Sequence, residues 1–263
     1  PYSTTVFGAK IVSNLYDAEK ECWVITFDGD VTMIGYKAFN AKNLTGITIP
    51  DSVTTIGSDA FYNCSKLKNI HIPQNVTEIK GAFSGCTSLV GVHINDIVSW
   101  CSIYFDLNSL SPLSYAKNLY LNGELITDLV IPKEASFISG RAFRNCTCIT
   151  SITIEDGVTS IGEGTFSGCS SLTSVTIPSS ITYIGDSAFE GCTGTLYTDS
   201  GYMDCNSVYN SYYGTTSNVG TYIGSKFTEV IFGSNVKIIP PKAFIDCATI
   251  ERVSFGKDVA LIG

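Results

Sequence analysis

The sequence predicts a β-rich right-handed solenoid whose coils are 22–23 residues long, with a parallel sheet on one face and short 3-10 or helical turns and irregular segments elsewhere. A repeated unit is the first observation: residues 158–180 read VTSIGEGTFSGCSSLTSVTIPSS, and residues 53–75 read VTTIGSDAFYNCSKLKNIHIPQN. The second is a regular spacing of phenylalanines, 22 or 23 residues within each block of repeats, at Phe39, Phe61 and Phe83, at Phe143, Phe166 and Phe189, and again at Phe244. A fixed period of this length indicates a stack of similar coils.

Each part of the unit predicts one element of the coil. In the strand at 174–177, Val175 and Ile177 point inward while Ser174 and Thr176 point outward, because side chains alternate along a strand. Pro178 ends the strand because its nitrogen has no hydrogen to donate. The V-x-x-I-G segment at 158–162 forms a second inward-facing edge, in which glycine permits a tight corner. The A-F-x-x-C segment has the spacing of one helical or 3-10 turn that buries the Phe.

The chain ends differ from the regular coils. Residues 1–30 contain two strand-like stretches, 10–13 and 23–27, which predict an N-terminal capping hairpin. The solenoid then occupies residues 31–263. Its last coil stops at VALIG, before the expected A-F-x-x-C, and an uncapped apolar end favours aggregation. We therefore expect the natural protein to continue past Gly263.

Two internal segments interrupt the period. Residues 98–132 retain two strand-like ends, 119–121 and 129–131, and predict two degenerate coils with a bulged outer loop around 103–116. Residues 193–224 form a second interruption, rich in Tyr, Ser, Gly and Asn. Long insertions in a repeat protein lie at the surface and tend to carry function.

Composition argues against several classes of partner. The chain has 16 Lys and Arg against 24 Asp and Glu, a net charge of −8, and no basic run. A surface that follows phosphates needs clustered Lys and Arg, so nucleic acid and anionic membranes are not expected partners. No stretch of about 18 apolar residues occurs, so no membrane insertion is expected within this sequence.

Six of the ten cysteines occupy one slot of the repeat, at Cys64, Cys86, Cys146, Cys169, Cys192 and Cys247. We expect them to stack inside the coils as small buried hydrophobic groups. A disulfide framework is the alternative, but side chains in parallel register present poor Cβ geometry for a bridge. A zinc site needs four converging ligands, and the pair Cys146-x-Cys148 alone does not predict one.

Only two histidines occur, and they do not predict catalysis. His71 and His93 are 22 residues apart and share one outward strand position, so they should lie on adjacent strands about 5 Å apart. A two-His metal or pH-sensitive patch is one interpretation, and two solvated residues in a surface row is the other. No Ser-His-Asp or Cys-His set can be assembled around them. The sequence therefore predicts no enzyme, no metal site and no cofactor.

Two surfaces are candidate binding sites. The first is the outward row of the main sheet, which is mildly polar and uncharged and runs through Thr48, His71, His93, Tyr120, Val130, Thr153, Thr176, Ile231 and Ser254. Repeat proteins often bind along their sheet face, although Thr is also common in strands for its β propensity alone. The second is the Tyr-rich insert, with Tyr197, Tyr202, Tyr209, Tyr212, Tyr213 and Tyr222. Tyrosine gives amphipathic contacts at low entropic cost, but these side chains could equally pack over the coil edge.

The unit SIGEGTFSGCSSLTSVTIP at 160–178 resembles the repeat of the BspA-type leucine-rich-repeat family of bacterial and protozoan surface proteins. The resemblance covers nearly the whole chain, including the segments KIVSNLYD, YAKNLYLNGELITDLVIP and KFTEVIFG. The sequence departs from the family unit at Ala41, where Cys is expected, and at Lys80-Gly81, where one residue is missing. The resemblance implies a secreted or cell-surface protein, and it implies no catalytic residues.

The predicted function is therefore interaction. The resemblance implies adhesion or binding to other proteins, such as host extracellular-matrix or cell-surface proteins. A carbohydrate-binding surface module is the alternative, because Tyr-rich loops can stack on sugar rings. The composition agrees with either function, because two Met and two His leave little material for general-base or metal chemistry.

Overall fold

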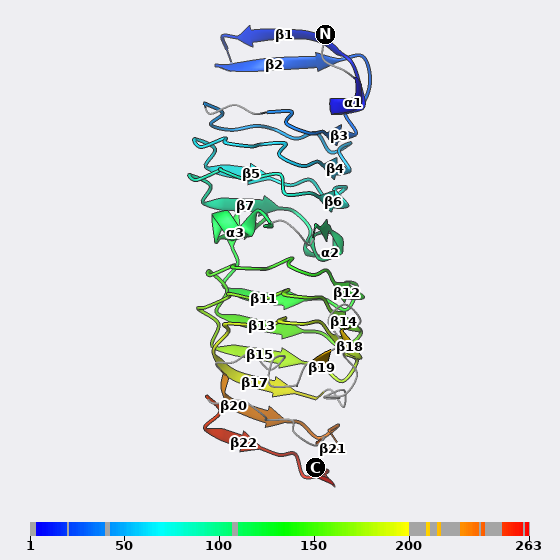
Figure 1. The fold of residues 1–263 in the computed structure, drawn as a ribbon, viewed down its shortest axis with the longest axis vertical. Helices are drawn as coiled ribbons and strands as arrows, with labels where there is room; N and C mark the ends of the chain where they lie inside the picture. Colours follow the sequence, from blue (N-terminus) through cyan, green and yellow to red (C-terminus); the bar gives the residue numbers. More distant parts are fainter. Residues whose placement is uncertain are drawn as a thin grey trace.

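The protein is an elongated stack of coils with the two chain termini at opposite ends (Figure 1). The computed structural model describes residues 4–19, 21–39, 43–106, 110–199, 209–210, 215–216, 227–236, 238–239, 249–259 and 261–262. The predicted solenoid is confirmed: strands that follow each other at the coil period pair side by side in parallel. Helix is confined to a few short segments in the described chain.

The main sheet runs along one side of the stack in two blocks. Parallel pairing joins β5 (Asn69–His71), β7 (Gly91–Ile94) and β9 (Leu119–Leu121), and β10 (Glu124–Leu125) is antiparallel to β9. The second block joins β11 (Asp128–Ile131), β13 (Ser151–Ile154), β15 (Ser174–Ile177), β17 (Gly194–Thr198), β20 (Phe227–Phe232) and β22 (Arg252–Ser254). The sheet is interrupted between β9 and β11.

A second, narrower set of strands lies at the V-x-x-I-G segments. One sheet contains β3 (Met33–Ile34), β4 (Thr55–Ile56), β6 (Glu78–Ile79) and β8 (Tyr104–Phe105). Another contains β12 (Phe137–Ile138), β14 (Ser160–Ile161) and β16 (Tyr183–Ile184), and the last pair is β21 (Ile238–Ile239) and β23 (Leu261–Ile262). This side is interrupted at the same level as the main sheet.

The core is a column of side chains between the two sets of strands. Phe143 stacks on Phe166 and Phe166 on Phe189, with ring centroids 5.3 and 5.4 Å apart and nearly parallel planes. These three rings are buried, as are the described slot cysteines and most inward residues of the described strands. The A-F-x-x-C segments are turns closed by bonds from residue i+3 to residue i, for example from the Cys169 N–H to the Phe166 oxygen. The core therefore has the composition that the repeat predicts.

Two positions in each regular turn adopt left-handed backbone. One directly precedes the slot cysteine and holds Asn or Gly in every described case, at Asn63, Gly85, Asn145, Gly168 and Gly191. The other precedes the Ala-Phe or Thr-Phe pair, at Lys37, Asp59, Gly81, Arg141, Gly164 and Ser187. Asn and Gly tolerate this conformation best, so the first position is recognisable in the sequence and the second is not.

Glycine in the V-x-x-I-G segment has a different role from the tight corner predicted for it. Gly162 and Gly185 are not among the residues with positive φ. A Cβ at Gly162 would lie 2.3 Å from the backbone nitrogen of Gly140, and one at Gly185 would lie 2.4 Å from that of Glu163. These glycines are therefore required by the close approach of neighbouring coils.

The N-terminal residues pack on the first coil. Helix α1 (Thr4–Phe7) leads into the antiparallel strands β1 (Ile11–Asp17) and β2 (Cys22–Phe27), which lie beyond β3 at the end of the stack (Figure 1). The buried ring of Phe7 contacts Phe27 and Phe39, with centroids 5.2 and 5.7 Å away. Its position supports a role for residues 1–30 as an N-terminal cap, which stays a proposal.

The bulged outer loop predicted around 103–116 is wrong. Helix α2 (Ile97–Ser102) leads into β8, which pairs with β6, and α3 (Leu113–Ala116) buries Leu113 and Ala116. The segment therefore contributes to the core. Its apolar residues lie at a spacing that differs from the regular repeat, and for this reason the repeat pattern did not reveal them.

Candidate binding surface

The outward row predicted from the sequence is present on the main sheet. We call the residues at this position of the strands the central row. It comprises Tyr197, which the register adds, and the predicted residues His71, His93, Tyr120, Val130, Thr153, Thr176, Ile231 and Ser254. Register places them opposite one another on adjacent strands, except across the interruption. Their strand neighbours point inward and are mostly buried, as in β13, where Ile152 and Ile154 flank the exposed Thr153. Thr48 is exposed but lies outside any strand.

The interruption divides the central row into two segments. His71, His93 and Tyr120 form the first segment, and the six residues from Val130 to Ser254 form the second. Sequence reasoning treated the row as continuous because the strand ends at 119–121 and 129–131 both fit the pattern. The physical reason for the break is β10, which pairs with β9 in the antiparallel direction instead of letting β11 join.

The first segment is aromatic. His71 and His93 are register partners, as predicted, and the His93 ring stacks on the Tyr120 ring with centroids 4.5 Å apart and planes 12° apart. The Nε2 of His93 lies 3.3 Å from the Oδ1 of Asn69. Partial burial, with a smaller contribution from the charge of His71, lowers the pKa of His93. Near neutral pH the stack is therefore an uncharged, half-exposed aromatic surface.

The second segment combines threonine with exposed apolar groups. Val130 and Tyr197 are 50% and 43% exposed, and the exposed Thr153 and Thr176 lie between them in register. Tyr197 was assigned to the insert in the sequence analysis, whereas the structure places it in β17, a regular strand of the main sheet. The alternation in GTLYT carries that information, because Leu196 and Thr198 are buried while Tyr197 is exposed.

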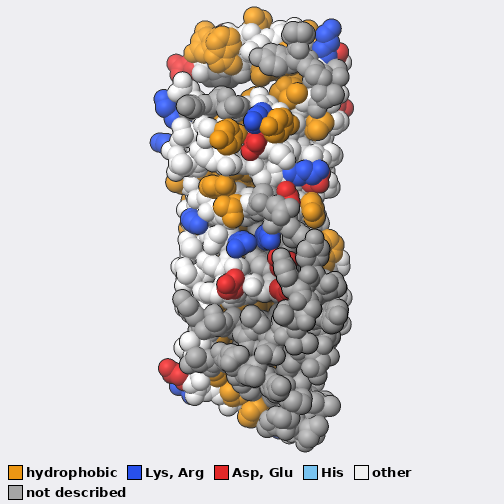
Figure 2. Space-filling model, viewed as in Figure 1, with side chains coloured by type: hydrophobic (Ala, Val, Ile, Leu, Met, Phe, Trp, Pro, Cys, Tyr) orange, Lys and Arg blue, Asp and Glu red, His pale blue; other side chains and the backbone are white. Residues whose placement is uncertain are grey.

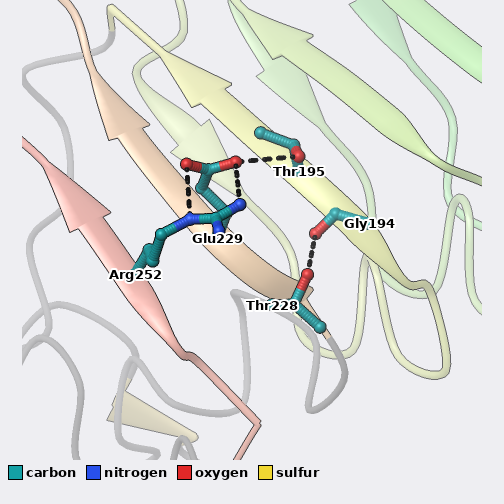
Figure 3. Close-up of polar contacts among 5 residues, drawn as sticks. All are labelled: Gly194, Thr195, Thr228, Glu229 and Arg252. Atoms are coloured by element: carbon teal, nitrogen blue, oxygen red, sulfur yellow. Dashed lines mark hydrogen bonds and ion pairs between the residues drawn. The ribbon is translucent and has the colours of Figure 1, made fainter.

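A second outward row, which sequence reasoning missed, runs beside the central row. We call it the flanking row, and it comprises Asn69, Gly91, Asp128, Ser151, Ser174, Thr195, Glu229 and Arg252. Arg252 donates from Nε and from one terminal guanidinium nitrogen to the two carboxylate oxygens of Glu229, at 3.2 and 3.4 Å (Figure 3). The Thr195 hydroxyl lies 3.4 Å from the same carboxylate. The polar groups of this end of the face thus bind one another across three strands.

The insert is described only in part. Tyr209 belongs to β18 (Tyr209–Asn210), which pairs antiparallel with β19 (Thr215–Thr216), and its side chain lies outside the described residues. Three further candidates also lie outside the described residues, as does one more tyrosine of the insert: Tyr202, Tyr212, Tyr213 and Tyr222. A binding role for the insert stays a prediction.

The N-terminal hairpin carries exposed apolar side chains that the sequence analysis did not identify. Trp23, Leu15, Val12 and Tyr16 are 68%, 67%, 65% and 55% exposed, and the rings of Tyr16 and Trp23 meet edge to face at 5.7 Å. Hydrophobic side chains are visible at this end of the molecule in Figure 2, whereas the charged groups of that face are scattered. Tyr16 and its register partner Trp23 share one face of the hairpin, whereas Leu15, the neighbour of Tyr16 in β1, points to the other face.

The slot cysteines of the described chain are buried free thiols, as predicted: Cys64, Cys86, Cys146, Cys169 and Cys192. Most donate to the backbone of the preceding coil; the thiols of Cys169 and Cys192 donate to the oxygens of Phe143 and Phe166, each at 3.2 Å. The sixth, Cys247, lies outside the described residues, as does Ala41. Cys146 differs, because its Sγ lies 3.4 Å from the Sγ of Cys148.

Comparison with known families gives a clear result. The sequence matches the model of the BspA type leucine-rich repeat region, in six copies, over residues 9–124, 114–217 and 215–263. The chain belongs to the BspA-type leucine-rich-repeat family. Proteins with such repeats are typically binding proteins rather than enzymes.

Solved structures of other leucine-rich-repeat proteins are similar to this BspA-type protein. A T. pallidum protein is 24% identical, covers 73% of this chain and 88% of its own, and has a TM-score of 0.39. One from Eubacterium ventriosum is 21% identical, with coverages of 89% and 72% and a TM-score of 0.46. A leucine-rich cell surface protein from Faecalibacterium prausnitzii is 21% identical, with 92% of both chains covered and a TM-score of 0.31. A search among curated proteins gives no match.

The described part of the BspA-type chain contains no group of three His, Cys, Asp or Glu side chains placed to hold a metal ion. In particular, His71 and His93 are accompanied on the sheet by Asn69 and Tyr120 rather than by carboxylates. The helices described here are four to six residues long, and none could span a membrane.

Proposed function

We propose that this BspA-type protein is secreted or displayed on a cell surface and binds another protein through the outward face of its main sheet. The observation that carries the proposal is the central row: register aligns its side chains on adjacent strands, with aromatic and aliphatic groups left exposed among threonines. Tyrosine is favoured at protein interfaces because it combines a large apolar area with a polar tip.

The chemistry of this face favours a protein partner. It is rich in hydroxyl and apolar groups, and its charges at Glu229 and Arg252 pair with each other. A net charge of −8 argues against a polyanionic ligand. Family membership supports an interaction role in general, and extracellular-matrix or host cell-surface proteins are the partners we propose to test first.

Binding should be measured against a panel of immobilised extracellular-matrix proteins. Tyr197→Ala, on the main sheet, and Tyr183→Ala, on the second set of strands, form a matched pair because these tyrosines are 43% and 45% exposed and belong to the same coil. We expect Tyr197→Ala, combined with Tyr120→Ala, to weaken binding at least tenfold, which is about 1.4 kcal/mol. Tyr183→Ala should bind like the wild type.

Three outcomes would redirect the proposal. The site would lie in the insert if the sheet variants bound like the wild type and replacement of Tyr202, Tyr212 and Tyr213 by Ser abolished binding. A glycan array bound through Tyr120 and Tyr197, with no protein of the panel bound, would favour the carbohydrate-binding alternative. Equal loss in both members of the Tyr197 and Tyr183 pair would show a general destabilisation rather than a binding face.

A further inference from the structure

The pair Cys146 and Cys148 departs from the repeat in a chemically specific way. In the other coils the residue two positions after the slot cysteine is polar or glycine: Lys66, Ser88, Ser171, Gly194 or Thr249. Here it is Cys148, which is half-buried and packs at the margin of the core. The departure therefore places a second thiol beside a slot cysteine at one level of the stack.

The surroundings of Cys146 also differ from those of the next slot cysteine. Cys169 donates its thiol hydrogen to the Phe143 oxygen in the preceding coil. The segment that precedes the coil of Cys146 is irregular and contains α3. The thiol of Cys146 lies 3.4 Å from that of Cys148. Cys146 is fully buried, whereas Cys148 is partly accessible. One thiol of the pair can therefore meet a reagent from solvent while the other is held against it from inside.

The hydrogen-bond network distributes the proton unequally. The hydrogen bond between the two thiols, together with a backbone hydrogen bond at Leu119, lowers the pKa of Cys148 to about 7 against the opposing effect of partial burial. The same hydrogen bond, followed by burial, raises the pKa of Cys146 well above its ordinary value. By contrast, burial raises the pKa of Cys192 to about 12. A lowered pKa enlarges the fraction of Cys148 that is thiolate, the nucleophilic form.

We propose that Cys146 and Cys148 form a thiol–disulfide exchange site, in which Cys148 attacks a low-molecular-weight disulfide and Cys146 resolves the product. In the first step the Cys148 thiolate bonds to one sulfur of the reagent, the reagent's S–S bond breaks, and a small thiolate leaves. In the second step the sulfur of Cys146 bonds to the sulfur of Cys148, and the bond to the second half of the reagent breaks. The thiol proton of Cys146 passes to a released small thiolate. The protein thiols lose two electrons and the reagent gains them.

The geometry permits the second step. The two sulfurs must move from 3.4 Å to the S–S bond length of about 2.0 Å, within a segment of turns and not in a strand. The attack occurs between neighbours, so Cys146 needs no access to solvent. The site is separate from the proposed binding face, because these residues follow the A-F turn and not the main-sheet strand.

The test uses the folded protein and oxidised glutathione, with peptide mass spectrometry after alkylation. Wild type should form a Cys146–Cys148 disulfide, Cys146→Ser should accumulate a stable glutathione adduct on Cys148, and Cys148→Ser should form neither product. Cys169 and Cys192 in the same molecule are internal controls, which should stay unmodified because they are buried. At pH 7 Cys148 should react about fivefold faster than a thiol of the urea-unfolded chain, since its larger thiolate fraction outweighs its lower nucleophilicity.

Two results would overturn the proposal. One is a folded Cys146→Ser variant, shown by circular dichroism, in which Cys148 gains no adduct. The other is a wild-type Cys148 that reacts no faster than the thiols of the unfolded chain. If Cys146→Ser does not fold, the wild-type time course decides: an adduct on Cys148 must appear before the disulfide.

Discussion

At the scale of single residues, the close packing of successive coils depends on glycine, which has no side chain. Successive coils approach closely at Gly162, where a Cβ would lie 2.3 Å from the nitrogen and 2.7 Å from the Cα of Gly140. These are backbone atoms of the neighbouring coil, which cannot move aside as the end of a flexible side chain can. Gly162 therefore permits the close approach of these two coils.

This contact leads to a prediction about alanine. Gly162→Ala should lower the free energy of unfolding by about 3 kcal/mol, because the added methyl group forces two coils apart. Gly46→Ala is the control, since a Cβ there meets nothing within 4 Å, and it should change stability by less than about 0.5 kcal/mol. Urea denaturation measures both. Similar small effects for the two variants would show that the coils are not held at this distance.

The buried thiols give the protein a predictable alkaline sensitivity. Burial raises the pKa of Cys192 to about 12, whereas the same thiol in an unfolded chain titrates near its ordinary value of 9.0. Between these values the unfolded chain releases a proton that the native state keeps. Stability contributed by this group is thus complete below pH 9 and falls as the pH rises, by about 1.4 kcal/mol per pH unit.

The measurement compares the free energy of unfolding of the wild type with that of Cys192→Ala. Cys192→Ala should be less stable than wild type at about pH 8, because it loses the hydrogen bond to the Phe166 oxygen and some packing. The gap between the two should narrow by about pH 11, since only the wild type loses this contribution. Lysines and tyrosines titrate in both proteins and cancel. Denaturation under reducing conditions measures both proteins. A difference in unfolding free energy that stayed constant from about pH 8 to about pH 11 would contradict this prediction.

At the scale of elements, each coil is stabilised through its neighbours. The Phe166 ring lies between those of Phe143 and Phe189, both within 5.4 Å, and it is fully buried. Neighbour interfaces of this kind are the main source of stability in a solenoid. The stacked turns of Phe143, Phe166 and Phe189 therefore form a column within the second block.

Removing one ring should disturb this column locally and severely. Phe166→Ala should cost about 3–5 kcal/mol, because the surrounding turns cannot collapse into the cavity. Phe137 is the matched control: it lies in β12 with 44% of its surface exposed, so Phe137→Ala should cost less than about 1 kcal/mol. Thermal and urea denaturation test both. A loss below 1 kcal/mol for Phe166→Ala would place that ring outside the core.

Most of this element-level structure could be predicted from the sequence, because the signals that encode it are periodic. Inward Ile and Val, the Phe column and the buried slot cysteines recur every 22 or 23 residues. Elements that occur once were missed: α2, β8 and α3 bury Trp100, Phe105 and Leu113 at a spacing no other coil shares. Tyr197 was assigned to the insert because it is followed by an irregular segment, although the alternation around it is regular.

The candidate binding surface was predictable in part, for a related reason. Alternation along each strand reveals which residues face outward, so the central row could be read from the repeats. Pairing between strands is not local information, and the break between β9 and β11 depends on the direction in which β10 returns. The flanking row was missed because its members differ in chemical type from coil to coil, from Asn69 to Arg252.

At the scale of the whole molecule, the stack consists of two blocks joined by irregular structure. Both sets of strands are interrupted at the same level, between β8 to β10 and β11 to β12 (Figure 1). Specific bonds cross this junction: the Trp100 indole donates to the Ala142 oxygen at 3.1 Å, and the Ser139 N–H donates to the Cys101 oxygen at 2.8 Å. Helix α2 therefore connects the blocks where sheet pairing does not.

The junction should be the place where cooperativity can be weakened. Trp100→Phe keeps a buried ring but removes the Nε1 donor and leaves the Ala142 oxygen without it, which should cost about 1–3 kcal/mol. Hydrogen exchange should accelerate at the Ser139 amide, next to the junction. The Phe166 amide, whose bond to the Ala188 oxygen lies within the second block, should be affected less.

The other tryptophan of the chain provides the control. Trp23 is 68% exposed on the N-terminal hairpin, so Trp23→Phe should leave both stability and the exchange of the Ser139 amide unchanged. If Trp100→Phe accelerated the Ser139 and Phe166 amides equally, the two blocks would open as one unit. The bonds from α2 would then join them as strongly as continuous strand pairing does, and the interruption of the sheets would have no consequence for cooperativity.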